Sequence, residues 1–77
     1  MDRATLVQLL NEAETLLYRE EQQLARQREV IDGLQRAGHD TTPARLQLRR
    51  LEGRQARHIA ERNRLFKQLA DQAPSRA

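Results

Sequence analysis

Five polar residues interrupt an otherwise apolar helical pattern, and a glutamate and a histidine among them could do chemistry. They are Glu20, Gln27, Gln55, His58 and Arg62. Carboxylates and imidazoles from facing helices form metal sites in helical bundles, but those sites need several carboxylates and a Glu-x-x-His spacing, which this chain lacks. We therefore expect no metal. We interpret the five residues as fixing the register of the helices, because a slip would bury them unpaired; the alternative is a polar pocket inside the bundle.

Nucleophilic and phosphate chemistry have little support. His39 and Asp40 are adjacent in the expected turn, where such residues are ordinary polar loop residues and Asp40 can cap the following helix. No Ser or Cys lies beside a His in a way that would activate a nucleophile, and there is no Gly-rich phosphate loop. We expect a protein that is not an enzyme, with no catalytic residues and no cofactor.

Arginine supplies nearly all of the positive charge, and most of it lies in the second half of the chain. The formal net charge is +3, from 14 basic and 11 acidic residues. Residues 2–37 are mildly acidic and residues 43–73 are basic, so that two antiparallel helices would attract each other.

Four arginines of the second half follow a helical spacing that places them on one face, away from the apolar seam. They are Arg50, Arg54, Arg57 and Arg64. Such a stripe could contact the phosphates of a nucleic acid, or it could dock an acidic protein surface. The near absence of Lys and of aromatic residues that could stack on bases favours the second interpretation, or a simply solvated face.

Two long helices must position these side chains. The first is predicted over residues 2–37, because Asp2 is a good N-cap and no Pro follows before the turn. Apolar residues fall along it in alternating steps of three and four: Leu6, Leu10, Ala13, Leu17, Leu24, Ile31 and Leu34. A second column, Leu9, Leu16, Gln23 and Val30, makes the stripe wider than a two-stranded coiled coil requires.

A short turn is predicted over residues 38–42, followed by a second helix over residues 43–73. Gly38 suits a helix C-cap, and Thr41 or Thr42 ahead of Pro43 is typical of a new helix start. Pro74 should end the second helix and leave residues 74–77 as a frayed tail. Because so short a turn makes its helices antiparallel neighbours, the fold class is an all-α, antiparallel two-helix hairpin that forms a single domain over residues 1–77.

The turn also predicts how the two helices are aligned. In the predicted register Glu20 faces Arg62, Leu17 faces Leu65, and Leu24 faces His58. This alignment sets a polar residue against each break in the apolar seam, except where His58 meets Leu24.

One hairpin of this size is marginally stable, since a short chain buries only roughly 60% of its unfolded surface. The chain has no cysteine that could add a disulfide or a thiolate-held metal. We therefore expect a homodimer, in which two hairpins form a four-helix bundle. The residues expected at the dimer or partner interface are Leu9, Leu16, Val30, Ile59 and Phe66.

No apolar run is long enough to cross a bilayer, and the N-terminus lacks the pattern of a signal peptide. We therefore expect a soluble, cytoplasmic protein without a membrane partner.

Short motifs between residues 25 and 65 carry a resemblance. They are Ala25-Arg26-Gln27-Arg28-Glu29, Val30-Ile31 with Leu34, Gly38-His39-Asp40-Thr41, and His58-Ile59-Ala60-Glu61-Arg62 with Arg64-Leu65. In these pieces and their order the chain resembles a group of short proteobacterial helical-hairpin, coiled-coil proteins. The resemblance implies a hairpin fold and a bacterial or phage-borne origin, but no biochemical activity.

Together these features predict a non-enzymatic protein–protein interaction module. It would be a small bacterial or phage-type adaptor or inhibitor that acts as a helical-hairpin dimer on an unidentified protein. The alternative is a hairpin that binds RNA or DNA through the arginine stripe, and a third interpretation is a purely self-assembling structural element.

Overall fold

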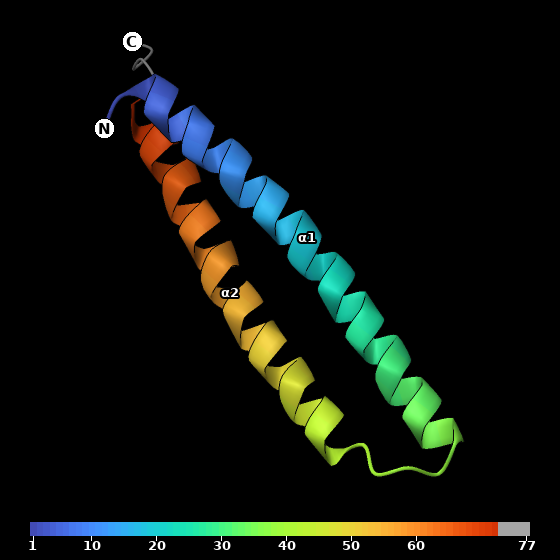
Figure 1. Ribbon diagram of the computed structural model, residues 1–77. Coiled ribbons are helices and arrows are strands. Elements are labelled where there is room, and N and C mark those ends of the chain that lie inside the picture. Colours follow the sequence, from blue (N-terminus) through green and yellow to red (C-terminus); the bar gives the residue numbers. More distant parts are fainter. Residues whose placement is uncertain (73–77) are drawn as a thin grey trace.

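The computed structural model describes residues 1–72 and consists of two long helices side by side (Figure 1). Helix α1 spans Arg3–Arg36 and helix α2 spans Thr42–Asp71. The start of α1 lies beside the end of α2, so the helices are antiparallel, and they form a rod of 63 × 19 × 15 Å. The predicted all-α hairpin is confirmed. The predicted end of the second helix at residue 73 and the predicted tail, residues 74–77, lie outside the described residues.

Both ends of α1 are capped as the sequence predicts. At its start, the Asp2 side chain accepts a hydrogen bond from the backbone N–H of Thr5 at 2.8 Å. At its end, Gly38 has a φ of 75°, and the N–H of His39 donates to the carbonyl of Leu34 at 2.9 Å. This is the Schellman arrangement, in which a left-handed residue lets the chain turn back over the last carbonyls. Gly38 therefore fixes where the hairpin turns.

The start of helix α2 is capped by the side chain of Asp40 and not by that of Thr41, the first of the two threonines that mark the predicted helix start. The backbone N–H of Thr42 donates to the Asp40 side chain at 3.0 Å, whereas the side chain of Thr41 makes no capping hydrogen bond. Pro43 lies in the first turn, where its missing N–H costs nothing. Asp40 therefore caps the second helix, a role that its place in the predicted turn makes possible.

The core is a single apolar seam between the helices. Its six buried apolar residues are Leu6, Leu10, Leu17, Leu24, Ile31 and Leu65. All but Leu65 belong to α1, because the middle of α2 presents polar side chains to the seam. Over residues 1–72, neither helix has a segment that is long and apolar enough to span a membrane.

The predicted register is wrong by about one to two helical turns. Leu65 packs against Leu6 and Leu10 near the chain's N-terminus rather than facing Leu17. Gln72 also reaches the backbone carbonyl of Met1 at 2.6 Å, which places the end of α2 beside the start of the chain.

The shift has a physical reason in the middle of the seam. The predicted register set His58 against Leu24, which would leave a polar ring facing an apolar side chain. In the structure His58 meets Glu20 at 2.6 Å, and Arg62 lies 3.9 Å from Glu14 instead of facing Glu20. The observed alignment gives each of these basic side chains a carboxylate.

Candidate functional site

A buried carboxylate lies in the middle of the seam. The Glu20 side chain is 6% exposed, and its Oε2 is 2.6 Å from Nδ1 of His58 and 3.5 Å from Nε of Arg54. Its other oxygen, Oε1, is buried without a hydrogen-bond partner among the described residues. Since a buried carboxylate is costly unless it is paired, the cluster of Glu20, Arg54 and His58 can tie the helices to one alignment.

The other predicted polar residues of the seam lie at separate levels along the rod. Gln27 donates to the backbone carbonyl of Ala44 at 2.9 Å, and Gln55 is half-buried without a hydrogen bond among residues 1–72. Arg62 pairs with Glu14. Of the five residues expected to act together, Glu20 and His58 are the pair that a hydrogen bond joins within residues 1–72.

Arg54 is the member of the cluster whose observed position differs from the predicted one. It was expected on an outward stripe, but it leans across to α1 and donates to the Gln23 side chain at 3.3 Å. The sequence spacing does indicate this position, because Arg54 lies four residues before His58 and therefore on the face of α2 that borders the seam.

Arg64, at the far end of the predicted stripe, is engaged within its own helix. Its guanidinium donates to Glu61 at 3.0 Å, and this hydrogen bond holds the pKa of Glu61 below its ordinary value and raises that of Arg64. Within residues 1–72, Arg50 and Arg57 form no ion pair or side-chain hydrogen bond. The predicted stripe of four thus becomes two unpaired arginines and two paired ones.

Arginines of α1 join those of α2 on the same side of the hairpin. Three hollows of 280, 260 and 290 Å³ overlap in their lining residues there: the first and second share Arg19 and Gln23, and the second and third share Arg54. We call the five arginines that line them the arginine strip: Arg19, Arg26, Arg50, Arg54 and Arg57. Arg19 and Arg26 are not predictable members of this surface, because the sequence pattern of one helix does not show which residues of the other helix lie beside it.

The other side of the hairpin combines exposed apolar side chains with charged ones. A hollow of 290 Å³ there is lined by Tyr18 and Ile59 together with acidic residues such as Glu21. Val7 and Phe66 lie seven residues from Glu14 and Ile59 along their helices, which places them on the same side. We call this surface the apolar flank: Val7, Tyr18, Ile59 and Phe66, all of them exposed.

The predicted interface residues are therefore divided between the two sides of the hairpin. Ile59 and Phe66 belong to the apolar flank, whereas Leu16 lines the same hollow as Arg19 and Arg54. Val30 shares a column with Leu16, two heptads further along α1, and is half exposed. Leu9 is partly buried against the core.

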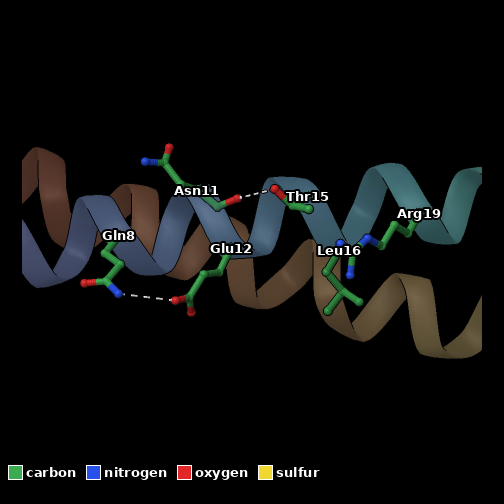
Figure 2. A pocket seen from close by; sticks show the side chains of 6 residues that line it. All are labelled: Gln8, Asn11, Glu12, Thr15, Leu16 and Arg19. Carbon is green, nitrogen blue, oxygen red and sulfur yellow. Dashed lines mark hydrogen bonds between the residues drawn. The ribbon is translucent and has the colours of Figure 1, made fainter.

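A further hollow, of 360 Å³, lies on the outer surface of α1 (Figure 2). All six side chains that line it project from this one helix, and Figure 2 shows hydrogen bonds from Gln8 to Glu12 and from Thr15 to the carbonyl of Asn11. It is a groove between turns of a helix rather than a cavity between elements. Through Leu16 and Arg19 it continues into the arginine strip.

Chemistry-bearing side chains do not converge elsewhere in the described part of the chain. No group of three or more His, Asp or Glu residues with metal-binding geometry occurs within residues 1–72. His39 is exposed in the turn, and its neighbour Asp40 is engaged in capping α2. Comparison of the chain with known protein families, with curated proteins and with solved structures found no match.

Proposed function

We propose that this chain is a non-enzymatic protein–protein interaction module, a small bacterial or phage-type adaptor or inhibitor that acts in the cytoplasm as a helical-hairpin dimer. The observation that supports it is the apolar surface left outside the hairpin. Within residues 1–72, eight large apolar side chains are exposed. Single exposed apolar residues are normal, but several of them on one narrow rod gain stability from a partner that covers them.

The apolar flank suits contact with a second copy better than the arginine strip does. In a two-fold symmetric dimer each surface patch meets its own copy. Copies of the arginine strip would bring like charges together, whereas copies of the apolar flank would bury Ile59 and Phe66 and complete a four-helix bundle.

A mass measurement in solution tests this proposal. We expect a species of about twice the chain mass of 9.0 kDa, and we expect Ile59→Lys or Phe66→Lys to convert it to monomer. Leu46→Lys is the matched control, because Leu46 is as exposed as Phe66, at 47% against 48%, but lies outside the apolar flank, four residues before Arg50. A monomer at every concentration would contradict the dimer.

A second candidate function is nucleic-acid binding, and the position of Arg19 and Arg26 favours it more than the sequence did. These two residues extend the positive surface of α2 onto α1. Salt separates the two functions, since binding driven by phosphate contacts weakens steeply as salt rises, whereas an apolar protein contact responds little. Retention of DNA or RNA that is unchanged in Arg50→Glu/Arg57→Glu would exclude this candidate.

A further inference from the structure

The arginine strip is a continuous positive surface, because arginines outnumber the carboxylates that line its hollows. Among residues 1–72, the only carboxylate that lines its three hollows is that of Glu20, which is buried and already engaged by His58 and Arg54. Within residues 1–72, the other four arginines of the strip make no ion pair. Acidic side chains border the strip at Glu12, which lines the neighbouring hollow with Arg19, and at Glu29 and Glu61, which lie three and four residues from Arg26 and Arg57 along their helices. Glu61 is already engaged by Arg64. The strip therefore favours an anionic occupant.

Apolar side chains lie within and beside the same surface. Leu16 lines the central hollow of the strip and is 40% exposed, and Val30 continues its column at 50% exposed. Together with Gln23 they repeat every seven residues along α1, a spacing that matches one face of a helix laid alongside. An occupant that gains from this column must carry apolar groups as well as negative charge.

These features favour a protein over a nucleic acid. Nucleic-acid phosphates would gain nothing from Leu16 or Val30, and no aromatic side chain lines the strip to stack on a base. Tyr18 lies on the opposite side of the hairpin, in the hollow lined by Ile59.

We infer that the arginine strip, with Leu16 and Val30, is the docking groove for an acidic amphipathic helix of another protein. The incoming helix would lie along α1 and α2, with its apolar residues on the Leu16 column and its Asp and Glu residues against the arginines on either side. This inference rests on the proposed interaction function and names the chemistry of the partner. It also assigns the two sides of the hairpin to different contacts, the apolar flank to a second copy and the strip to the foreign helix.

A designed peptide probes this groove directly. The probe is a fluorescent helix of three heptads with Leu at every seventh position and Glu on both sides of the Leu stripe, and its control has Lys in place of each Glu. We expect the full chain to bind the Glu peptide and not the Lys peptide. Amide shifts in NMR spectra should change along residues 16–30 and 50–57 rather than around Ile59 and Phe66.

Matched variants separate the strip from the rest of the surface. Arg50→Glu/Arg57→Glu should weaken binding of the Glu peptide about tenfold or more, and Leu16→Ser should weaken it about as strongly. Arg49→Glu and Val7→Ser should leave it unchanged, because Arg49 lies outside the strip on the same helix and Val7, which is as exposed as Leu16, lies on the apolar flank.

Three outcomes would overturn the inference. They are absence of binding to the Glu peptide, equal binding by the strip variants, and tight, salt-sensitive binding of a DNA or RNA duplex in place of the peptide. The mass of the free protein, measured on the same samples, reports on the proposed dimer separately. Loss of peptide binding with an intact dimer would therefore overturn the docking groove alone.

Discussion

The carboxylate of Glu20 is buried in the seam, and the free-energy cost of burying it depends on the residues of α2 that face it. His58 and Arg54 both approach the same oxygen, while Oε1 stays buried without a partner in the described part of the chain. A buried pair of this kind adds little net stability over apolar residues, but it strongly penalises alignments that separate the partners. The cluster therefore contributes specificity of register more than it contributes stability.

This balance predicts opposite results for single and double substitutions. His58→Ala leaves Glu20 with Arg54 alone and should lower the free energy of unfolding by about 2 kcal/mol. Glu20→Leu/His58→Leu removes both polar groups and should be at least as stable as the parent chain. Urea denaturation at one fixed protein concentration measures both. Exposed Glu29→Gln is the control and should stay within about 0.5 kcal/mol. A His58→Ala variant as stable as this control would show that the cluster has no energetic role.

The sequence identified Glu20 and His58 as seam residues but paired Glu20 with Arg62. Spacing along one helix shows which residues face inward, whereas the pairing depends on how far α2 slides along α1. That slide follows from the path of the turn around Gly38 and from the match of Glu20 with His58, and neither is visible in the pattern of one helix.

At the scale of the helices, local sequence predicts where each helix begins and ends better than it predicts which residues pair across the seam. Asp2 caps α1, Gly38 closes it and Asp40 starts α2, each through contacts with residues two to five positions away. Such local contacts were predictable because they need no knowledge of the partner helix.

Glycine substitutions test the turn. Gly38→Ala should destabilise the hairpin by about 1 kcal/mol, since a φ of 75° is strained for any residue with a Cβ. Gly33→Ala and Gly53→Ala should each stabilise it by roughly 0.5–1 kcal/mol, because both lie inside helices with open space around an added Cβ. Thermal unfolding of the three variants gives the comparison. Stabilisation by Gly38→Ala would mean that the turn does not hold this conformation.

The caps also predict how the helix ends respond to acid. Hydrogen bonds from Thr5 to Asp2, and from Thr42 to Asp40, lower the pKa of each carboxyl. A lowered pKa in the folded state means that the capping contribution is present above the ordinary pKa of the carboxyl and is lost as pH falls through the lowered value. Amide exchange in the first turns of α1 and α2 should therefore quicken, beyond its intrinsic pH dependence, as pH falls from about 5 to about 2.

Asparagine at the same positions is the matched control. Asn caps a helix about as well as Asp but does not titrate in this range. Asp2→Asn and Asp40→Asn should remove the acid response at the corresponding helix start and leave the other one unchanged. A response that persists in the Asn variants would assign it to other groups.

For the whole molecule, the sequence does not predict that the arginine strip and the apolar flank lie on opposite sides of the hairpin. Leu16 and Ile59 looked like parts of one interface because each borders an apolar stripe on its own helix. In the antiparallel hairpin Leu16 lies with Arg19 and Arg54, whereas Ile59 lies with Tyr18 and Glu21. Only the relative rotation of the helices decides this, and it requires both helices at once.

A dimer held by the apolar flank makes thermal stability depend on protein concentration. Because association stabilises the folded state by mass action, each tenfold rise in concentration should favour the folded dimer by about 1.4 kcal/mol and raise the Tm by several degrees. Phe66→Lys should lower the Tm and abolish this dependence, since a monomer unfolds without a change in the number of molecules. Leu46→Lys, which lies outside the apolar flank, should keep the dependence of the parent chain. A Tm that does not depend on concentration in the parent chain would contradict the dimer. Val7, Ile59 and Phe66 would then be free for a foreign partner, as is proposed for the arginine strip.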